Sequence, residues 1–384
     1  MEEKVIRPNR SEPMLSSWLN SRGCRDGLPI GGNFELTARC NFNCKMCYVH
    51  LQSDSDALRR QELTADQWLS IASDARDMGM IFLLLTGGEP FLREDFPYLY
   101  EQLIKMGIMV SINTNASLYN EELRRLFLRY PPSRINATLY GGSEKTYASL
   151  CGNPSFERVV SNLRQMKEDG LQVRLNVSLT PHNACDMEKI DAISREIGLQ
   201  AKAAAYMYPP VRVDGTKGEN TGRFSAREAG QAMAQWHAIR DDREHFLSRA
   251  QALRHLESAE LTETCVDVEQ EGVQCRAGRS SFWMTWDGKM MPCGTMDAGA
   301  AYPLRDGFAE AWRRVREYTA AIRMPKSCAA CPKRKNCSVC ASICKGETGE
   351  FDCRPSYLCE MTDSMICAIL SKAEEVEAQC ENPV

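Results

Sequence analysis

The chain has 384 residues, of which 43% are hydrophobic and 26% charged, a composition that excludes a disordered polypeptide and allows more than one domain. The formal net charge of -4 gives no general electrostatic reason to expect nucleic acid, and the short basic run at 333–335 is more typical of a solvated loop. The longest apolar run, at 80–85, is far shorter than the roughly 18 residues that a membrane helix needs. The start, MEEKVIRPNR, lacks the apolar region of a signal peptide. We therefore expect a cytoplasmic protein with no nucleic-acid or membrane partner.

The first two hundred residues alternate between strand and helix patterns. Residues 1–33 predict an extended or partly ordered lead-in, and a regular alternation begins after them. Strands are predicted at 34–38, 81–86, 109–113, 135–139, 173–179 and 201–206, and helices at 64–78, 95–106, 120–129, 156–169 and 186–197. Six such units form a parallel α/β sheet but are too few for a closed eight-stranded barrel. The pattern predicts an open, partial (β/α)6 TIM-like barrel over residues 34–208.

The remainder of the chain lacks this alternation of strand and helix patterns. A helical linker is predicted over 209–264, beginning with a capping box at Ser225 and Glu228. A cysteine-rich domain is predicted over 265–365, with a β-hairpin at 281–293 and a short helix at 308–318. A C-terminal helix and tail complete the chain over 366–384, the helix itself being predicted at 363–378.

Eighteen cysteines in a chain of this kind indicate metal sites rather than a disulfide framework. They form an N-terminal triad and a dense second group between 265 and 367. Five others, Cys24, Cys151, Cys185, Cys367 and Cys380, stand apart and are interpreted as isolated thiols.

The triad, Cys40, Cys44 and Cys47, follows the first predicted strand in a C-x3-C-x2-C run with Phe42 and Tyr48 interleaved. A structural zinc ion takes four ligands, and an ordinary [4Fe-4S] cluster takes four cysteines. Three thiolates from one loop therefore leave either a distant fourth ligand or an open iron. After the second strand comes Gly87-Gly88-Glu89-Pro90, where glycines permit close backbone approach and the carboxylate matches an ammonium group, although a simple turn has the same pattern.

These stretches resemble the radical S-adenosylmethionine (SAM) superfamily, over roughly residues 34–365. The resemblance implies that the triad binds a [4Fe-4S] cluster whose fourth iron takes the amino and carboxylate groups of SAM, and that an added electron cleaves SAM to methionine and a 5'-deoxyadenosyl radical. It implies that the GGEP segment holds the methionine amino group. Further cofactor contacts are implied for Phe42, Tyr48, Asn113, Thr114, Asn115, Asn176 and Ser178. A water or a backbone carbonyl could instead be the partner of such an inward asparagine or serine. The family often has an aspartate where this chain has Tyr140.

The second cysteine group resembles the SPASM domain, which holds auxiliary iron-sulfur clusters in radical SAM enzymes that act on peptides and proteins. The resemblance implies two auxiliary [4Fe-4S] clusters, an outer one on Cys328, Cys331, Cys337 and Cys359, and an inner one on Cys275, Cys293 and one or both of Cys340 and Cys344. The spacing departs from the usual pattern because Cys340 falls two residues after Cys337. Cys265 and Cys353 are reserve candidates, and a zinc ribbon is the alternative for the whole group.

The function that this resemblance implies is maturation of a ribosomal peptide or a protein through a thioether or carbon-carbon crosslink. One alternative is an anaerobic sulfatase-maturating type of enzyme that oxidises a cysteine or serine and needs an aspartate base, and a second is a non-enzymatic iron-sulfur or zinc protein. A reductant such as flavodoxin or ferredoxin is expected. The lead-in is too short for a winged-helix leader-binding domain, so a separate leader-binding protein is an option. Tyr206, Tyr208 and Arg212 are expected to edge the substrate space, with a core or rim role as the alternative, and no catalytic acid or base stands out.

Overall fold

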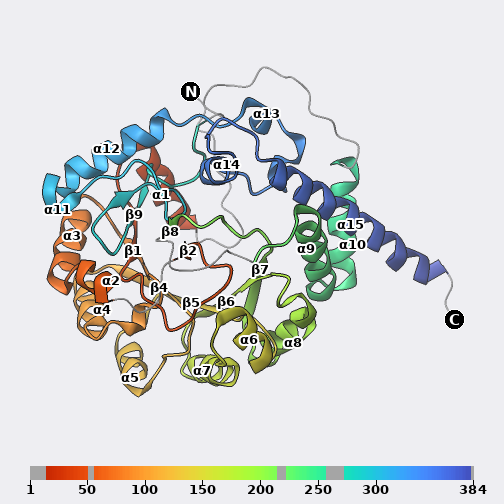
Figure 1. The fold of residues 1–384 in the computed structure, drawn as a ribbon, viewed down its shortest axis with the longest axis horizontal. Helices are drawn as coiled ribbons and strands as arrows, with labels where there is room; N and C mark the ends of the chain where they lie inside the picture. Colours follow the sequence, from red (N-terminus) through yellow and green to blue (C-terminus); the bar gives the residue numbers. More distant parts are fainter. Residues whose placement is uncertain (1–13, 51–55, 214–221, 257–271, 382–384) are drawn as a thin grey trace.

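A single mixed sheet organises the computed structural model, which describes residues 14–50, 56–213, 222–256 and 272–381. Figure 1 shows its strands near the centre of the molecule, with helices around them. The sheet has eight strands in the order β10-β9-β1-β3-β4-β5-β6-β7. Its parallel strands include β1 (Gly31–Glu35), β3 (Phe82–Thr86), β4 (Met109–Thr114), β5 (Arg134–Thr138), β6 (Val173–Ser178) and β7 (Gln200–Ala204). The predicted six-unit partial barrel is confirmed.

Helices cover the outer face of this sheet because each connection between parallel strands crosses over it. They are α3 (Ala65–Asp77), α4 (Phe96–Lys105), α5 (Glu121–Arg129), α6 (Glu144–Cys151), α7 (Phe156–Glu168) and α8 (Met187–Ile197). The α3 helix begins at a complete capping box between Thr64 and Gln67, as its sequence predicts. Buried apolar side chains of strands and helices, such as Leu85, Ile112 and Trp68, form one core behind the sheet. The strand faces turned the other way carry the polar residues of the site.

The hairpin of the cysteine-rich domain is part of the barrel sheet. Strand β9 (Ser281–Met284) pairs in parallel with β1, and β10 (Met290–Met291) pairs antiparallel with β9. The sequence predicts this hairpin but gives no sign of its partner, because the pairing joins segments far apart in the chain. The sheet therefore continues across the boundary expected at residue 265, and the domain limits remain predictions.

Several helices depart from expectation. The lead-in, expected to be extended or partly ordered, contains α1 (Met14–Asp26), and β1 begins at Gly31 rather than at 34. Helix α6 has no predicted counterpart. The closing helix α15 (Ser356–Glu381) begins seven residues before the predicted start at 363 and includes Cys359. It packs along α9 (Ala226–Arg240) and α10 (Arg243–Leu253) through buried residues such as Phe246 and Ile369.

The remaining elements are short and connect the barrel to the cysteine-rich region. Strand β2 (Val49–His50) pairs in parallel with β8 (Arg212–Val213) in a second, two-stranded sheet. The other helices are α2 (Asp56–Gln61), α11 (Pro303–Asp306), α12 (Phe308–Ala321), α13 (Lys326–Ala329) and α14 (Ala341–Thr348), with 3-10 turns at Pro90–Leu92, Ala184–Asp186, Arg254–Leu256 and Pro332–Lys335. Among the described residues, no helix is both long and apolar enough to cross a membrane.

Candidate active site

A cavity of about 380 Å³ lies at the carboxyl ends of the barrel strands, and all three triad cysteines line it. Its volume is within the range of small-molecule sites. Of the predicted cofactor-binding residues, the cavity also brings together Phe42, Tyr48, Gly87, Gly88, Asn113, Thr114, Asn115, Asn176 and Ser178. Glu89 and Pro90 are not among the lining residues; both lie buried beneath the turn. Tyr206 and Tyr208 line the cavity as expected, whereas Arg212 does not.

Helix α6 anchors the cysteine loop. The backbone amide of Asn43 donates to the carbonyl of Cys151 at 2.7 Å, and that of Lys45 donates to the carbonyl of Leu150 at 3.0 Å. Phe42 is only 3% exposed and meets the Tyr147 ring edge to face, with 6.3 Å between the ring centroids. Phe42 thus serves as the loop's packing anchor as well as a wall of the cavity. The loop's conformation depends on a helix that the sequence pattern did not reveal.

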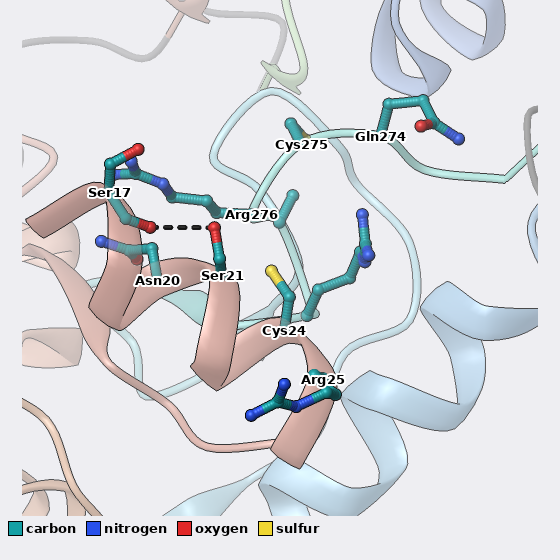
Figure 2. Close-up of a pocket in the computed structure, with 10 residues that line it drawn as sticks. Ser17, Asn20, Ser21, Cys24, Arg25, Gln274, Cys275 and Arg276 are labelled. Atoms are coloured by element: carbon teal, nitrogen blue, oxygen red, sulfur yellow. Dashed lines mark hydrogen bonds between the residues drawn. The ribbon is translucent and has the colours of Figure 1, made fainter. Parts of the chain in front are cut away.

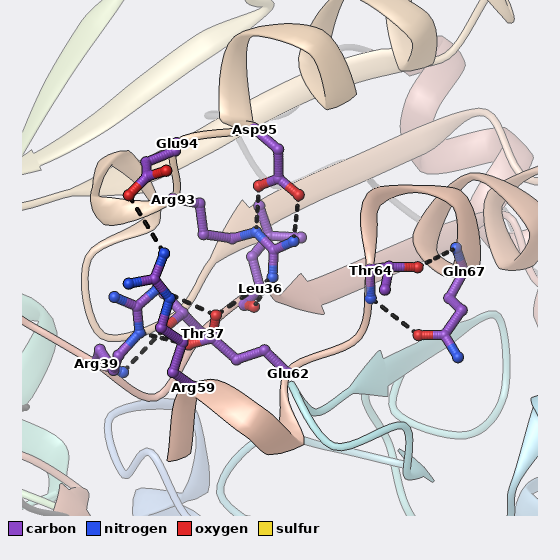
Figure 3. Close-up of polar contacts among 10 residues, drawn as sticks. All are labelled: Leu36, Thr37, Arg39, Arg59, Glu62, Thr64, Gln67, Arg93, Glu94 and Asp95. Carbon is purple, nitrogen blue, oxygen red and sulfur yellow. Dashed lines mark hydrogen bonds and ion pairs between the residues drawn. The ribbon is translucent and has the colours of Figure 1, made fainter. Parts of the chain in front are cut away.

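A buried ionic network fixes the chain between β1 and the cysteines (Figure 3). The Glu62 carboxylate accepts hydrogen bonds from the Thr37 hydroxyl and from Arg39, whose Nε lies 2.7 Å away. Arg93 lies 3.6 Å from the same carboxylate and donates to the Leu36 carbonyl at 3.1 Å. Arg93 also pairs with Asp95 at 2.7 Å. Because Arg39 directly precedes Cys40, this network sets the position at which the triad begins.

The two glycines after β3 are required by the approach of the chain's own backbone. The Gly88 amide donates to the Thr37 carbonyl at 2.7 Å, and the Glu89 amide donates to the Arg39 carbonyl at 2.9 Å. A Cβ atom on Gly88 would lie 2.1 Å from the Arg39 carbonyl oxygen, and one on Gly87 would lie 2.5 Å from that of Thr37. The glycine turn is thereby attached to the strand that leads into the cysteine loop.

Glu89 holds the neighbouring strand end. Its carboxylate accepts hydrogen bonds from the Thr114 hydroxyl at 2.8 Å and from the backbone amides of Asn115 at 2.8 Å and Phe91 at 3.2 Å. Burial raises the pKa of Glu89 to about 7, and these hydrogen bonds oppose the increase. Asn115 in turn donates from Nδ2 to Oδ1 of Asn41, within the cysteine loop, at 2.8 Å. Glu89 therefore connects the turn, strand β4 and the triad loop.

Inward-facing asparagines lie on three successive strands of the sheet, at two levels. Asn113 is the register partner of Asn136, which donates to it at 2.8 Å, and Asn176 on β6 is the register partner of Thr138 on β5. Sequence reasoning identified Asn113 and Asn176 but missed Asn136, Thr138 and the lining role of Tyr140. The alternation of polar and apolar residues could have identified them, because a polar residue at every second position of an otherwise apolar strand faces away from the core.

The cysteine-rich region brings the predicted outer set together. Cys328, Cys331, Cys337 and Cys359 line one small pocket, together with Val339, Pro355, Leu358, Arg334, Arg354 and Ser327. The four cysteines come from α13, the turn after it, the segment before α14, and the first turn of α15. Because the thiols fill a narrow space between helices, little room is left for another ligand.

The inner set is grouped around Cys340. Burial is the main cause that raises the pKa of Cys340, to about 11, and the nearby thiols of Cys293 and Cys275 contribute to this rise. Cys344 is fully buried in an apolar cluster with residues such as Val273 and Met296. Cys353 is exposed and does not line the outer pocket, and Cys265 lies outside the described residues.

Neither cysteine group resembles a site for a single metal ion. In the part of the chain that the structure describes, no three cysteine, histidine or carboxylate side chains are grouped closely enough to hold one ion. A zinc ribbon would require four such ligands around one point. An iron-sulfur cluster is larger, because its cysteines bind through several iron atoms.

Buried contacts join the barrel to the cysteine-rich region. Arg212 forms a 2.6 Å ion pair with Glu35 and donates to the Gly294 carbonyl at 2.9 Å, next to Cys293. Glu35 also accepts a hydrogen bond from Trp283 at 2.8 Å, and burial raises its pKa despite the Arg212 charge. Of the roles expected for Arg212, the structure agrees with the core role, because Arg212 is buried in this contact and does not line the cavity. Beside the cavity, Tyr206 donates to Glu347 of α14 at 2.5 Å.

Comparison with known proteins assigns this architecture. Residues 34–192 match the model of the Radical SAM superfamily. The chain is a radical SAM enzyme. An AdoMet-dependent heme synthase from Methanosarcina barkeri is 21% identical over 332 residues, which are 83% of this chain and 93% of the relative. A PqqA peptide cyclase from Streptomyces rochei is 24% identical over 318 residues, 80% of this chain and 83% of the relative.

The fold likeness extends beyond the radical SAM barrel. The crystal structure of Streptococcus suis SuiB bound to the precursor peptide SuiA aligns with a TM-score of 0.64 at 16% sequence identity, over 93% of this chain and 84% of SuiB. Since the alignment includes the cysteine-rich region, this radical SAM enzyme shares with SuiB an architecture of a barrel followed by a second, C-terminal region.

Membership of the superfamily implies a [4Fe-4S] cluster and SAM, and the cavity fits both. Cys40, Cys44 and Cys47 are the only cysteine, histidine or carboxylate side chains among the described residues that line it. Burial raises the pKa of Cys40, and the Glu89 carboxylate adds to the effect, so a bound cation would stabilise the thiolate. Three protein ligands beside open space agree with an iron that is left available.

Proposed function

We propose that this radical SAM enzyme is a maturase that oxidises a peptide or protein substrate, forming a thioether or a carbon-carbon crosslink. The observation that carries the proposal is the contrast between three cysteines beside an open cavity and a separate region with enough thiols for closed clusters. When bound, SAM and its cluster supply a 5'-deoxyadenosyl radical that removes a hydrogen atom from substrate. The protein's own residues bind and orient SAM and the substrate, and they exclude water.

The polar groups of the cavity suit the parts of SAM. Asn113, Asn136 and Asn176 offer amide donors and acceptors for ribose hydroxyls and a carboxylate. The turn at Gly87 and Gly88 brings backbone atoms to the cavity wall, where the methionine amino group would lie. Glu89 contributes to this site by fixing Thr114 and Asn115; direct contact between its carboxylate and the ammonium group remains a prediction.

Two auxiliary [4Fe-4S] clusters complete the proposal. Cys328, Cys331, Cys337 and Cys359 would hold the outer one, and Cys275, Cys293 and Cys340 the inner one, with Cys344 or Cys265 as the fourth ligand. Fully ligated clusters exchange electrons without binding substrate. The inner cluster would accept the electron that an oxidative modification releases, and Tyr208, which lines the cavity and packs in one apolar cluster with Cys340, lies along that route.

A peptide substrate is favoured by the combination of architecture and relatives. SuiB, which shares the fold, is known in complex with a precursor peptide, and the PqqA peptide cyclase resembles the chain over most of its length. The sulfatase-maturating alternative needs an aspartate base at the substrate. No aspartate or glutamate is among the described residues that line the cavity, so this alternative has less support.

Iron content and SAM cleavage test the cofactor part of the proposal. We expect about twelve irons per chain after anaerobic reconstitution, three clusters of four, and 5'-deoxyadenosine formation with dithionite and SAM. The Cys40→Ala/Cys44→Ala/Cys47→Ala variant should keep about eight irons and lose 5'-deoxyadenosine entirely. A Cys328→Ala/Cys359→Ala variant is the control, with a similar iron loss but retained cleavage of SAM. Zinc in the cysteine-rich region, or cleavage that survives the triple substitution, would refute the proposal.

Deuterium transfer tests the substrate class. Cells of the source organism grown in deuterated medium would supply a peptide fraction and a small-molecule fraction. If the substrate is a peptide, 5'-deoxyadenosine should gain deuterium only with the peptide fraction, and protease treatment beforehand should abolish the transfer. Transfer from the protease-resistant small-molecule fraction would instead favour a substrate closer to that of the heme synthase relative.

A further inference from the structure

A second cavity, of about 640 Å³, lies outside the active site, between α1 and the loop that carries Cys275. Figure 2 shows Ser17, Asn20, Ser21, Cys24 and Arg25 of α1 on one side and Gln274, Cys275 and Arg276 on the other. Arg279 also lines it. This cavity plays no part in binding SAM, because it shares no residue with the active-site cavity.

Cys275 differs from the other predicted auxiliary ligands in its exposure. Among the eight predicted auxiliary cysteines, all of which the structure describes, it is the only one classed as exposed; the others are buried or half-buried. Electron transfer between proteins requires close approach of the two redox centres. A cluster held in part by Cys275 would therefore be most accessible to a partner protein at this point.

Among the residues that the structure describes, those lining the cavity beside Cys275 carry positive charge. Arg25, Arg276 and Arg279 line the cavity, and no aspartate or glutamate is among the lining residues that the structure describes. Arg279 is held in place by a 3.0 Å hydrogen bond to the Val273 carbonyl. Arg25 keeps 64% of its side chain exposed while pairing with Asp26 at the outer edge. We call Arg25, Arg276 and Arg279 the arginine rim.

We propose that the arginine rim is the docking surface of a small acidic one-electron carrier protein. Redox partners form small, transient interfaces, and complementary charge mainly speeds their encounter. One electron passes from the reduced inner cluster to the oxidised carrier, so the cluster is oxidised and the carrier reduced by one electron, with no bond made or broken; a reduced carrier runs the same transfer in reverse. The inference rests on the proposed function, since it requires a cluster on Cys275.

Stopped-flow reduction by flavodoxin hydroquinone tests the docking surface. The enzyme is the reconstituted Cys40→Ala/Cys44→Ala/Cys47→Ala variant, so that the absorbance change reports auxiliary clusters alone. Adding Arg25→Glu and Arg276→Glu should lower the second-order rate constant about tenfold at low ionic strength, and added salt should reduce the difference. Arg125→Glu on α5, 78% exposed and outside this cavity, is the matched control and should stay within about twofold.

Small-molecule reduction separates docking from cluster loss. Dithionite should reduce every variant at the same rate, and iron content should be unchanged. If charge reversal disturbs iron content, the Arg25→Gln/Arg276→Gln variant replaces it, with a smaller decrease expected. Equal flavodoxin rates in rim and control variants would overturn the docking surface alone. A parent protein without the inner cluster's iron would overturn both this inference and the auxiliary-cluster proposal. A rim variant that keeps its flavodoxin rate but loses deuterium transfer from peptides, measured with an intact triad, would reassign the surface to substrate.

Discussion

The two cysteine regions of this enzyme differ in what surrounds their thiols. The triad lies on a loop at the open end of a parallel sheet, beside asparagines, glycines and tyrosines that leave space for a ligand. The outer set lies between short helices and is closed by residues such as Val339, Pro355 and Leu358. The number of thiols in a loop is therefore only part of the description: open space lies beside the triad thiols, whereas neighbouring side chains enclose the outer set.

The largest expected effect comes from Gly88→Ala, which disturbs the cavity beside the cysteine triad and leaves the cysteine-rich region unchanged. The new Cβ would lie 2.1 Å from the Arg39 carbonyl oxygen, so the turn and the start of the cysteine loop must separate. We expect no measurable SAM binding or 5'-deoxyadenosine, while the auxiliary iron remains. Gly107→Ala is the control, because nothing lies within 4 Å of the new Cβ; its φ of +80° should cost about 1 kcal/mol of stability and leave cleavage intact. Normal cleavage by Gly88→Ala would show that this backbone contact does not define the site.

Arg212→Met tests the connection between the two regions. It leaves the fully buried Glu35 without its cation and the Gly294 carbonyl without its donor. We expect a loss of about 3–5 kcal/mol in the unfolding free energy of the apoprotein, measured by denaturant titration without oxygen. The Glu35→Leu/Arg212→Met double variant should recover most of it. Arg125→Met, which breaks an exposed pair with Glu121, should change stability by about 0.5 kcal/mol at most. A similar small change for Arg212→Met would argue against a structural role for the buried pair.

Glu89→Gln tests the buried carboxylate of the open site through the pH dependence of stability. The folded-state pKa of Glu89 is about 7, above its ordinary value of 4.5, so the native apoprotein binds more protons than the unfolded chain between these values. Stability should therefore fall as pH rises through this window, by about 2–3 kcal/mol relative to the glutamine variant. Unfolding titrations of both apoproteins between pH 4.5 and 7.5 (about three units across) measure the difference. If the unfolding free energies of the two proteins changed with pH in the same way, the burial of the Glu89 carboxylate would be contradicted.

The smallest expected effect is that of Tyr206→Phe. The substitution removes a 2.5 Å hydrogen bond to Glu347 of α14, but Arg223 still donates to that carboxylate at 2.6 Å. We expect a cost of about 1 kcal/mol, seen as a lower midpoint of thermal unfolding. Tyr98→Phe, on the exposed side of α4, should have no effect. A loss of several kcal/mol would mean that barrel and cysteine-rich region depend on this contact more than on Arg212.

Much of the barrel could be predicted because most of its strands are short segments with apolar residues at successive or alternate positions, followed by a helix pattern. The triad, the glycine turn and Asn113 could be found for a related reason: they lie at strand ends, where a parallel sheet gathers side chains. Helix α6 was missed because its eight residues, EKTYASLC, make only about two turns, too few to establish a helical period. The α1 helix, whose apolar residues are interrupted by Ser, Asn and Arg, gives an equally weak periodic signal.

The long-range polar contacts could not be predicted in the same way. Glu35 stands between Phe34 and Leu36 in an apolar strand, and a buried carboxylate in that position indicates a buried cation. The sequence does not say which of the many arginines supplies it. The role of Glu89 was equally hidden, because a carboxylate that fits a ligand's ammonium group also fits backbone amides.

The pairing of β9 with β1 has a consequence for the order in which the protein assembles. Gly31 is the register partner of Ser281. One edge of the first barrel strand therefore stays unpaired until it meets a segment that is made after nearly the whole barrel has been synthesised. Contacts of such long sequence separation form slowly, and an unpaired strand edge invites aggregation in the meantime. On the ribosome, the barrel would therefore remain incomplete until the hairpin emerges. Cys293 follows this hairpin directly, so closure of the sheet and maturation of the inner cysteine site become late events of the same folding step.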